Sequence, residues 1–113
     1  MPELEDFSGI DLGVWRTLAE NIGLPQLQRF AQEYCVGLED EISRFPELAA
    51  EPQRLVRKAH QYAGSGSTMG FMKIRSLLIE IEENPAMQQG EALQNQCGLL
   101  IQEVACAHAF SRR

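Results

Sequence analysis

The sequence of 113 residues has little of what membrane-spanning and nucleic-acid-binding chains need. Its uninterrupted apolar runs are short, such as Leu77-Leu78-Ile79, far below the roughly 20 residues that cross a bilayer. Ten Lys and Arg residues are outnumbered by sixteen Asp and Glu residues, which gives a net charge of −6 at pH 7. This balance disfavours binding to phosphate backbones and to anionic lipid surfaces. We therefore expect no membrane span and neither a nucleic-acid nor a membrane partner.

Two further features concern the compartment. Cys35, Cys97 and Cys106 are an odd number of thiols, which predicts reduced, mostly buried side chains rather than a disulfide framework. Residues 1–6 are rich in acidic side chains, whereas a secretory signal is basic and then apolar. We therefore expect a cytoplasmic protein, and Met1 favours a free-standing chain.

Strand signals are nearly absent, since no stretch alternates apolar with polar residues and no Asn-Gly or Asp-Gly hairpin turn occurs. Apolar residues instead recur at the three- and four-residue intervals of amphipathic helices. A short helix is predicted behind the N-cap Asp11 and before Gly23, with the apolar stripe Leu12, Trp15, Leu18 and Ile22. Four longer helices are predicted after it: from Pro25 to just before Pro46, with the stripe Leu27, Phe30, Ala31, Tyr34, Leu38, Ile42 and Phe45; from Pro52 into a glycine-rich segment; from Gly70 to Asn84; and from about Glu91.

This succession of helices predicts an all-α fold. Brief connections force neighbouring helices to pack antiparallel, so we expect an up-and-down four-helix bundle with a short additional N-terminal helix. No repeat and no change of composition divides the chain. Residues 1–113 are therefore expected to form a single domain, as a monomer.

The helix from Pro52 breaks its own pattern near His60. It leads into Gly64-Ser65-Gly66-Ser67-Thr68, whose glycines and hydroxyls normally weaken or end a helix. At 100° per residue, His60 lies about 100° from the middle of the core-facing arc. We therefore expect its imidazole to be half exposed.

The neighbours of His60 on that shoulder are all compact: Val56, Ala63, Gly64 and Ser67. A solvated helix face ordinarily carries long polar side chains, so space has been cleared around this imidazole. Such a setting suits nucleophilic or acid–base work on a bulky partner, because an imidazole is largely neutral near pH 7. Geometry alone leaves open a second interpretation, an ordinary boundary histidine beside a flexible loop.

The segment Ala59-His60-Gln61-Tyr62-Ala63-Gly64-Ser65-Gly66-Ser67-Thr68-Met69-Gly70-Phe71 resembles the signature of histidine-containing phosphotransfer (HPt) domains. That signature has an apolar residue two after the histidine, a glycine four after it, small residues next, and then an apolar-glycine pair. His60, Tyr62, Gly64, Ser65, Met69 and Gly70 agree in register. The family's downstream apolar residues and closing apolar-acidic pair have counterparts in Ile74, Leu77, Leu78, Ile81 and Glu82.

The resemblance implies that His60 takes a phosphoryl group from the aspartyl phosphate of a receiver domain and gives it to another receiver. It implies receiver domains, and a hybrid sensor histidine kinase, as partners. The receiver supplies magnesium, so the chain needs no cofactor or metal and is a phosphocarrier rather than an enzyme with kinase activity. Gly64 would let the receiver approach, Ser67 would offer a hydrogen bond, and Val56 and Ala63 would support the contact.

One departure from the family concerns Ala63, where the family commonly has a lysine that helps to hold the phosphoryl group. Arg57, one turn before His60, and Lys73, from the next helix, are the candidate substitutes. The departure leaves open a non-phosphorylated HPt-like adaptor that binds and inhibits a receiver or kinase. An unrelated helical interaction module is a further alternative.

Other candidate sites are weaker. Cys106 and His108 lie about 200° apart on a helix, so they do not ligate one ion together, and Cys97 lacks the spacing to join them. We expect all three to be packing or tail residues.

Overall fold

The computed structural model describes residues 8–113. The acidic residues 1–6, on which the expectation of a cytoplasmic location rests, lie outside the described residues. Residues 8–113 are helical apart from short connections, and the only strand-like pairing among them is an isolated bridge between Ile10 and Phe71. The predicted all-α class is therefore confirmed.

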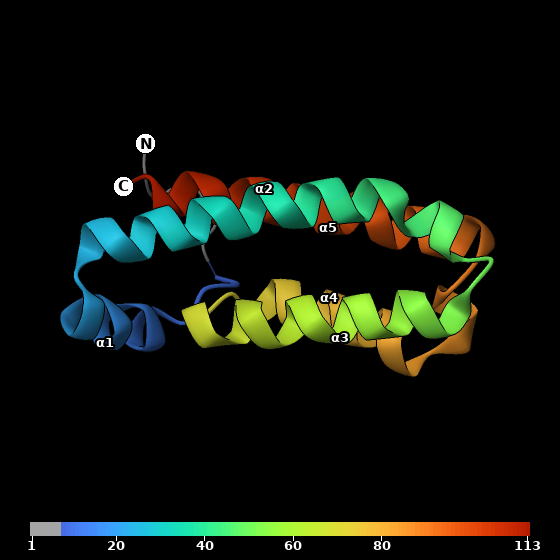
Figure 1. The fold of residues 1–113 in the computed structure, drawn as a ribbon, viewed down its shortest axis with the longest axis horizontal. Helices are drawn as coiled ribbons and strands as arrows, with labels where there is room; N and C mark the ends of the chain where they lie inside the picture. Colours follow the sequence, from blue (N-terminus) through green and yellow to red (C-terminus); the bar gives the residue numbers. More distant parts are fainter. Residues whose placement is uncertain (1–7) are drawn as a thin grey trace.

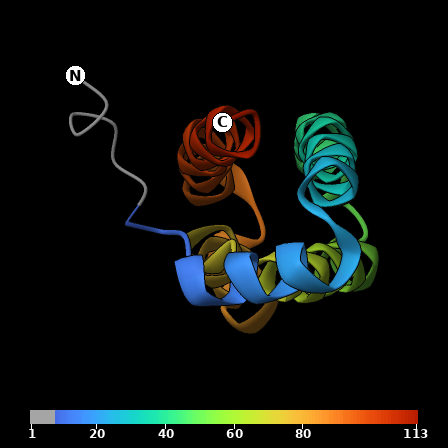
Figure 2. The same ribbon diagram turned by 90° about the vertical axis from the view of Figure 1, so that its left-hand side faces the viewer.

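The described chain contains five α-helices and one short 3₁₀ helix. They are α1 (Leu12–Ile22), α2 (Leu24–Leu48), α3 (Pro52–Met69), α4 (Met72–Glu83), η2 (Pro85–Met87) and α5 (Gly90–Ser111). Figure 1 shows α2 and α5 side by side in one layer and α3 and α4 in the other. Figure 2 shows α1 lying across the end of the α3 and α4 layer, where it also contacts α2.

The ends of α1 follow from its sequence. The Asp11 carboxylate accepts a hydrogen bond from the Val14 backbone N–H at 3.2 Å, and Gly23 ends the helix at φ 90°, a value that favours glycine. Its apolar stripe is only partly covered, however. Trp15 is buried, whereas Leu12 and Ile22 are 43% and 39% exposed, because α1 packs on its neighbours along part of one side only.

The end predicted for α2 is wrong. The helix continues through Pro46 to Leu48 instead of ending before the proline. Pro46 loses one N–H bond, but it lies in the last turn, and the Ala49 N–H still donates to the Phe45 carbonyl at 3.1 Å. The exposure of Phe30, 45%, also contradicts its place on the buried stripe.

The glycine-rich segment is helical, which corrects the expectation that it weakens or ends α3. The helix runs through Gly64 and Gly66 to Met69 and ends at Gly70, whose φ is 90°. The glycine at position 66 has a tertiary explanation: a Cβ there would lie 2.6 Å from the Tyr34 hydroxyl, which donates a hydrogen bond to the Tyr62 carbonyl at 2.6 Å. Gly66 therefore lets α2 approach α3 closely.

The last two helices follow the predicted pattern. In α4 the buried residues are Ile74, Leu77, Leu78 and Ile81, and in α5 the buried apolar residues are Leu93, Leu100, Val104, Ala107 and Phe110. A buried polar residue joins the two helices: Gln96 donates to the Leu77 carbonyl at 2.9 Å and to the Glu80 carboxylate at 2.8 Å. The sequence pattern did not indicate this bridge.

No disulfide joins the three cysteines, all of which lie in the described residues. Burial raises the pKa of the Cys35 thiol to about 12, with a smaller contribution from Glu39, and burial raises the pKa of the Cys97 thiol to about 11. An unfolded thiol ionises near pH 8.5, at about the value for a model peptide. Above that pH the unfolded chain binds fewer protons than the folded chain, so stability falls as the pH rises.

We therefore expect the free energy of unfolding to fall from about pH 9 towards pH 12. Between pH 7.5 and pH 10 the contribution of Cys35 is expected to be roughly 1–2 kcal/mol. Urea unfolding at the two pH values measures it. A Cys35→Ala variant, whatever its stability at pH 7.5, should lose less between them, and an equal loss in both proteins would contradict the assignment.

Candidate functional site

His60 lies in the middle of α3 and points away from the core. Its side chain is 75% exposed, which is more than the half exposure expected from the helical arc. The flanking positions explain this orientation, because Ala59 and Ala63 are buried on the inner side of α3. The imidazole is therefore held on a packed helix while its ring remains accessible.

A carboxylate from the neighbouring helix holds one ring nitrogen. The two oxygens of Glu82, on the last turn of α4, lie 3.0 Å and 3.1 Å from Nδ1 of His60. A carboxylate only accepts hydrogen bonds, so the proton of the neutral ring is on Nδ1 and the lone pair is on Nε2. The Glu82 side chain is 24% exposed. The pair thus presents Nε2 as a nucleophile with a defined orientation.

The imidazole lines a shallow hollow of about 590 Å³. Val56, Arg57 and Glu82 line it too, so the structure brings two of the predicted supporting residues next to His60. The other lining residues are Arg54, Lys58 and Gln61. Arg54 pairs with Glu51 at 3.1 Å and Lys58 with Glu41 at 3.7 Å, whereas Arg57 forms no ion pair within residues 8–113. Arg57 is therefore the cation available to an anion in this hollow.

The small residues after His60 differ in their positions. Gly64 is exposed, and no atom lies within 4 Å of a Cβ built there, so its surroundings are open. Ser67 is half-buried, and Ala63 is only 4% exposed. Ala63 therefore offers almost no surface to a partner, and its contribution is limited to keeping α3 close to its neighbours.

The structure does not bring Lys73 to His60. Lys73 is in the first turn of α4 and Glu82 in the last, and the 12 residues of this helix make it about 18 Å long. The Lys73 ammonium lies 3.9 Å from the carboxylate of Glu103 on α5. Of the two substitutes for the missing lysine, only Arg57 is beside the imidazole.

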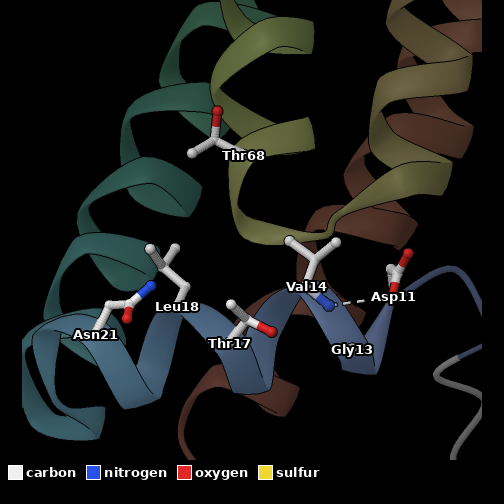
Figure 3. Close-up of a pocket in the computed structure, with 7 residues that line it drawn as sticks. All are labelled: Asp11, Gly13, Val14, Thr17, Leu18, Asn21 and Thr68. Atoms are coloured by element: carbon white, nitrogen blue, oxygen red, sulfur yellow. Dashed lines mark hydrogen bonds between the residues drawn. The ribbon is translucent and has the colours of Figure 1, made fainter.

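A second hollow continues the exposed side of α3 towards α1. It measures about 530 Å³ and lies between α1 and Thr68, two turns beyond His60. Figure 3 shows Val14 and Leu18 projecting from α1 towards the part of α3 that carries Thr68. Among residues 8–113, Asp11 is the only charged residue that lines it, and that carboxylate caps α1. His60, Gly64 and Thr68 thus form an exposed row that ends in a largely uncharged hollow.

Glu82 is the residue of the candidate site that the sequence analysis did not assign. A sequence signal existed, since Ile81 and Glu82 form the apolar-acidic pair that closes the HPt-like pattern. The packing of α4 on α3 brings Glu82 into contact with His60, although the two residues are 22 positions apart in the chain.

The other residues considered from the sequence, Cys97, Cys106 and His108, do not form a metal site. Among residues 8–113, no group of three His, Cys, Asp or Glu side chains is arranged to hold a metal ion. Cys97, Cys106 and His108 are half-buried on α5. Within the same residues, no helix combines the length and the apolar character that spanning a bilayer requires.

Comparison of the chain with models of protein families found no match, and searches among curated proteins and solved structures found none either.

Proposed function

We propose that the chain is a histidine phosphotransfer module of a cytoplasmic two-component phosphorelay, with His60 as the phosphoryl acceptor. In this proposal α2 to α5 form an antiparallel up-and-down four-helix bundle, and α1 is an additional helix that covers one end. The packing of α2 on α5, of α3 on α4 and of α4 on α5 supports this topology. The HPt-like residues then lie on α3 and α4, on either side of the exposed imidazole.

One observation carries the proposal: Nδ1 of His60 lies 3.0 Å from the Glu82 carboxylate while the side chain is 75% exposed. A boundary histidine needs neither a fixed tautomer nor an accessible ring. A nucleophile needs both, because its lone pair must be aimed at the electrophile and a macromolecular donor must reach it.

The reaction follows from this geometry. The Nε2 lone pair attacks the phosphorus of a receiver's aspartyl phosphate, an N–P bond forms, and the P–O bond to the aspartate breaks with its electrons on the departing carboxylate. The ring becomes cationic, and its Nδ1–H faces the Glu82 carboxylate. Arg57 is placed to attract the phosphoryl oxygens. Magnesium and the acidic pocket belong to the receiver, and the reverse reaction delivers the group to a second receiver.

The direct test is transfer from a receiver. The purified chain is incubated with a phosphorylated, magnesium-bound receiver domain from the same genome. We expect phosphate that is acid-labile and base-stable, located by mass spectrometry on the peptide that contains His60. Label on His108 instead would overturn the assignment, and a His108→Gln variant, which should accept at the wild-type rate, is the matched control.

The open space around Gly64 gives a second prediction. A Gly64→Leu variant is expected to accept phosphoryl at least tenfold more slowly, because its side chain would project one turn from His60, where the receiver must approach. The control is Gly98→Leu: Gly98 is also exposed within a helix, with no atom near a built Cβ. Equal transfer rates in the two variants would contradict the proposed approach.

A second candidate function is a non-phosphorylated adaptor that binds a receiver or kinase and inhibits it. It is favoured by Ala63, where the family commonly has lysine, and by the distance of Lys73 from the site. The transfer experiment separates the two functions, because an adaptor binds a receiver without becoming labelled.

A further inference from the structure

The side of α5 that points away from the core carries a regular row of residues. At intervals of three and four positions, this outer seam consists of Gln94, Gly98, Ile101, Ala105 and His108. The first four are exposed and His108 is half-buried, so no helix of residues 8–113 covers the row. Figure 2 shows α5 at the outside of the molecule, beside α2 and above the layer of α3 and α4. Intervals of three and four are the spacing at which one helix packs along another.

Charge is nearly absent from this side of α5. Between Glu91 and Arg112 the helix contains one Asp, Glu, Lys or Arg residue, Glu103, which is half-buried and forms an ion pair with α4. The exposed side of α2, in the same layer, carries charges such as Glu33 and Asp40. Because the centre of a protein–protein contact is depleted of charged residues, the outer seam has the composition of a contact surface.

The two ends of the seam carry opposite charges. Glu91 is in the first turn of α5, and Arg112 directly follows its last residue. Both are exposed, and neither forms an ion pair within residues 8–113. They continue the spacing of the seam, three positions before Gln94 and four after His108. An antiparallel helix of the same sequence therefore matches this seam along its whole length, with acid against base at each end.

A two-fold axis that passes between Ile101 and Gln102 gives this pairing. It places Gly98 opposite Ala105 of the second copy and brings Ile101 close to its own counterpart. The acidic end of each helix then meets the basic end of the other. A parallel pair would instead set like charges against each other at both ends.

Gly98 favours the close approach of a helix at this point. No atom lies within 4 Å of a Cβ built there, so nothing in residues 8–113 accounts for a glycine that costs about 1 kcal/mol relative to alanine in a helix. The glycine at position 66, in comparison, is explained by the Tyr34 hydroxyl. Opposite Ala105 of a second copy, Gly98 lets two helix axes come within the roughly 8–10 Å of packed helices.

We propose that two copies of the chain associate through the outer seam of α5 as an antiparallel, two-fold dimer. The chain has a net charge of −6, so two copies repel each other over most of their surface, and an uncharged seam with complementary ends avoids this repulsion. The seam is about 33 Å long and one helix wide, which is small for a specific interface. We therefore expect a reversible dimer with a Kd of roughly 10–100 μM, in place of the monomer expected from the sequence.

The dimer is independent of the proposed phosphotransfer. The hollow around His60 is lined by residues of α3 and by Glu82 of α4, and none of its lining residues is on α5. Both imidazoles therefore remain accessible in the dimer. A His60→Gln variant should dimerise as the wild type does.

Sedimentation equilibrium of the whole chain, from about 1 μM to 1 mM, measures the association. We expect Ile101→Glu to raise the Kd at least tenfold, because two carboxylates would then lie near the axis. Leu99→Glu is the matched control, since it adds the same charge at an exposed leucine of the same helix, about 160° around the helix from Ile101. It should leave the Kd nearly unchanged. Circular dichroism verifies that both variants fold.

Exchange of the end charges tests the antiparallel register. Glu91→Arg and Arg112→Glu each set like charges against each other, and each is expected to raise the Kd about threefold or more at low salt. The double variant Glu91→Arg, Arg112→Glu restores opposite charges, so its Kd should return close to the wild-type value. The two residues are at opposite ends of one helix, so this recovery requires a second copy.

Four results would overturn the proposal. The first is a chain that remains monomeric up to about 1 mM. The second is an equal effect of Ile101→Glu and Leu99→Glu, and the third is a double variant that dimerises as weakly as its single variants. The fourth is a dimer weakened by His60→Gln, which would place the interface on α3 instead.

Discussion

A His60→Gln variant is expected to accept no phosphoryl group from a receiver, even after long incubation, while it folds normally. Glutamine has no ring nitrogen with a lone pair, so the N–P bond cannot form. The replaced side chain is 75% exposed, and its removal leaves the core untouched. Label from a phosphorylated receiver measures acceptance, and circular dichroism with thermal unfolding verifies the fold.

The contribution of Glu82 is tested by the same measurement, the acceptance of label from a phosphorylated receiver. Glu82→Ala is expected to slow acceptance by about 10- to 100-fold, the range seen when a metal-ligating histidine loses the carboxylate that orients its ring. Glu82→Gln should fall between Ala and wild type, because its amide oxygen still accepts from Nδ1–H without the negative charge. The thermal midpoint should hardly change, since an ion pair to an exposed side chain contributes roughly 0–1 kcal/mol.

Glu83 provides the matched control for this series. It is an exposed carboxylate next to Glu82 on α4, and no interaction with His60 involves it. Glu83→Ala should transfer at the wild-type rate. A slow Glu83→Ala variant would mean that general charge matters rather than orientation, and a fast Glu82→Ala variant would contradict the role of the carboxylate.

Gly66→Ala is the change expected to cost most stability. The added Cβ would lie 2.6 Å from the Tyr34 hydroxyl and 3.3 Å from its ring carbon Cζ. Tyr34 cannot move aside easily, because its hydroxyl is bonded to the Tyr62 carbonyl and its ring packs on Tyr62 and Phe71. Overpacking of a core costs about 1–3 kcal/mol, which exceeds the roughly 1 kcal/mol that alanine gains over glycine in a helix. Urea unfolding measures the difference.

Two further variants test the cause. Gly98→Ala, on an open face of α5, should raise the free energy of unfolding by up to about 1 kcal/mol, so the two glycine substitutions are expected to have opposite signs. Tyr34→Phe removes the hydroxyl, so it should recover part of the stability lost in Gly66→Ala, and a double-mutant cycle gives the coupling. Additive effects, or a stabilising Gly66→Ala, would show that the contact is not the reason for glycine.

The sequence predicted those features that depend on neighbours in the chain. Asp11 and Gly23 set the ends of α1 because a cap and a left-handed residue act within one turn. Apolar residues that recur at three- and four-residue intervals likewise predicted the positions of α2 to α5. The errors arose where distant residues decide: Tyr34 on α2 leaves no room for a Cβ at Gly66 on α3, and the packing of α4 on α3 brings Glu82 to His60. His60 itself was identified from its compact neighbours and its resemblance to a family signature, and no local pattern gave the partner of its Nδ1.

The continuous helix between His60 and Thr68 has a consequence for association rates. A loop in this region would lose conformational freedom whenever a partner bound, roughly 1–2 kcal/mol for the backbone of each residue that became ordered. The helix has lost that freedom already on folding, and the Thr68 hydroxyl is bonded to the Gly64 carbonyl at 3.1 Å. In the proposed function, the receiver therefore meets a surface whose shape exists before contact, so less free energy is lost in ordering and brief encounters are sufficient for productive docking.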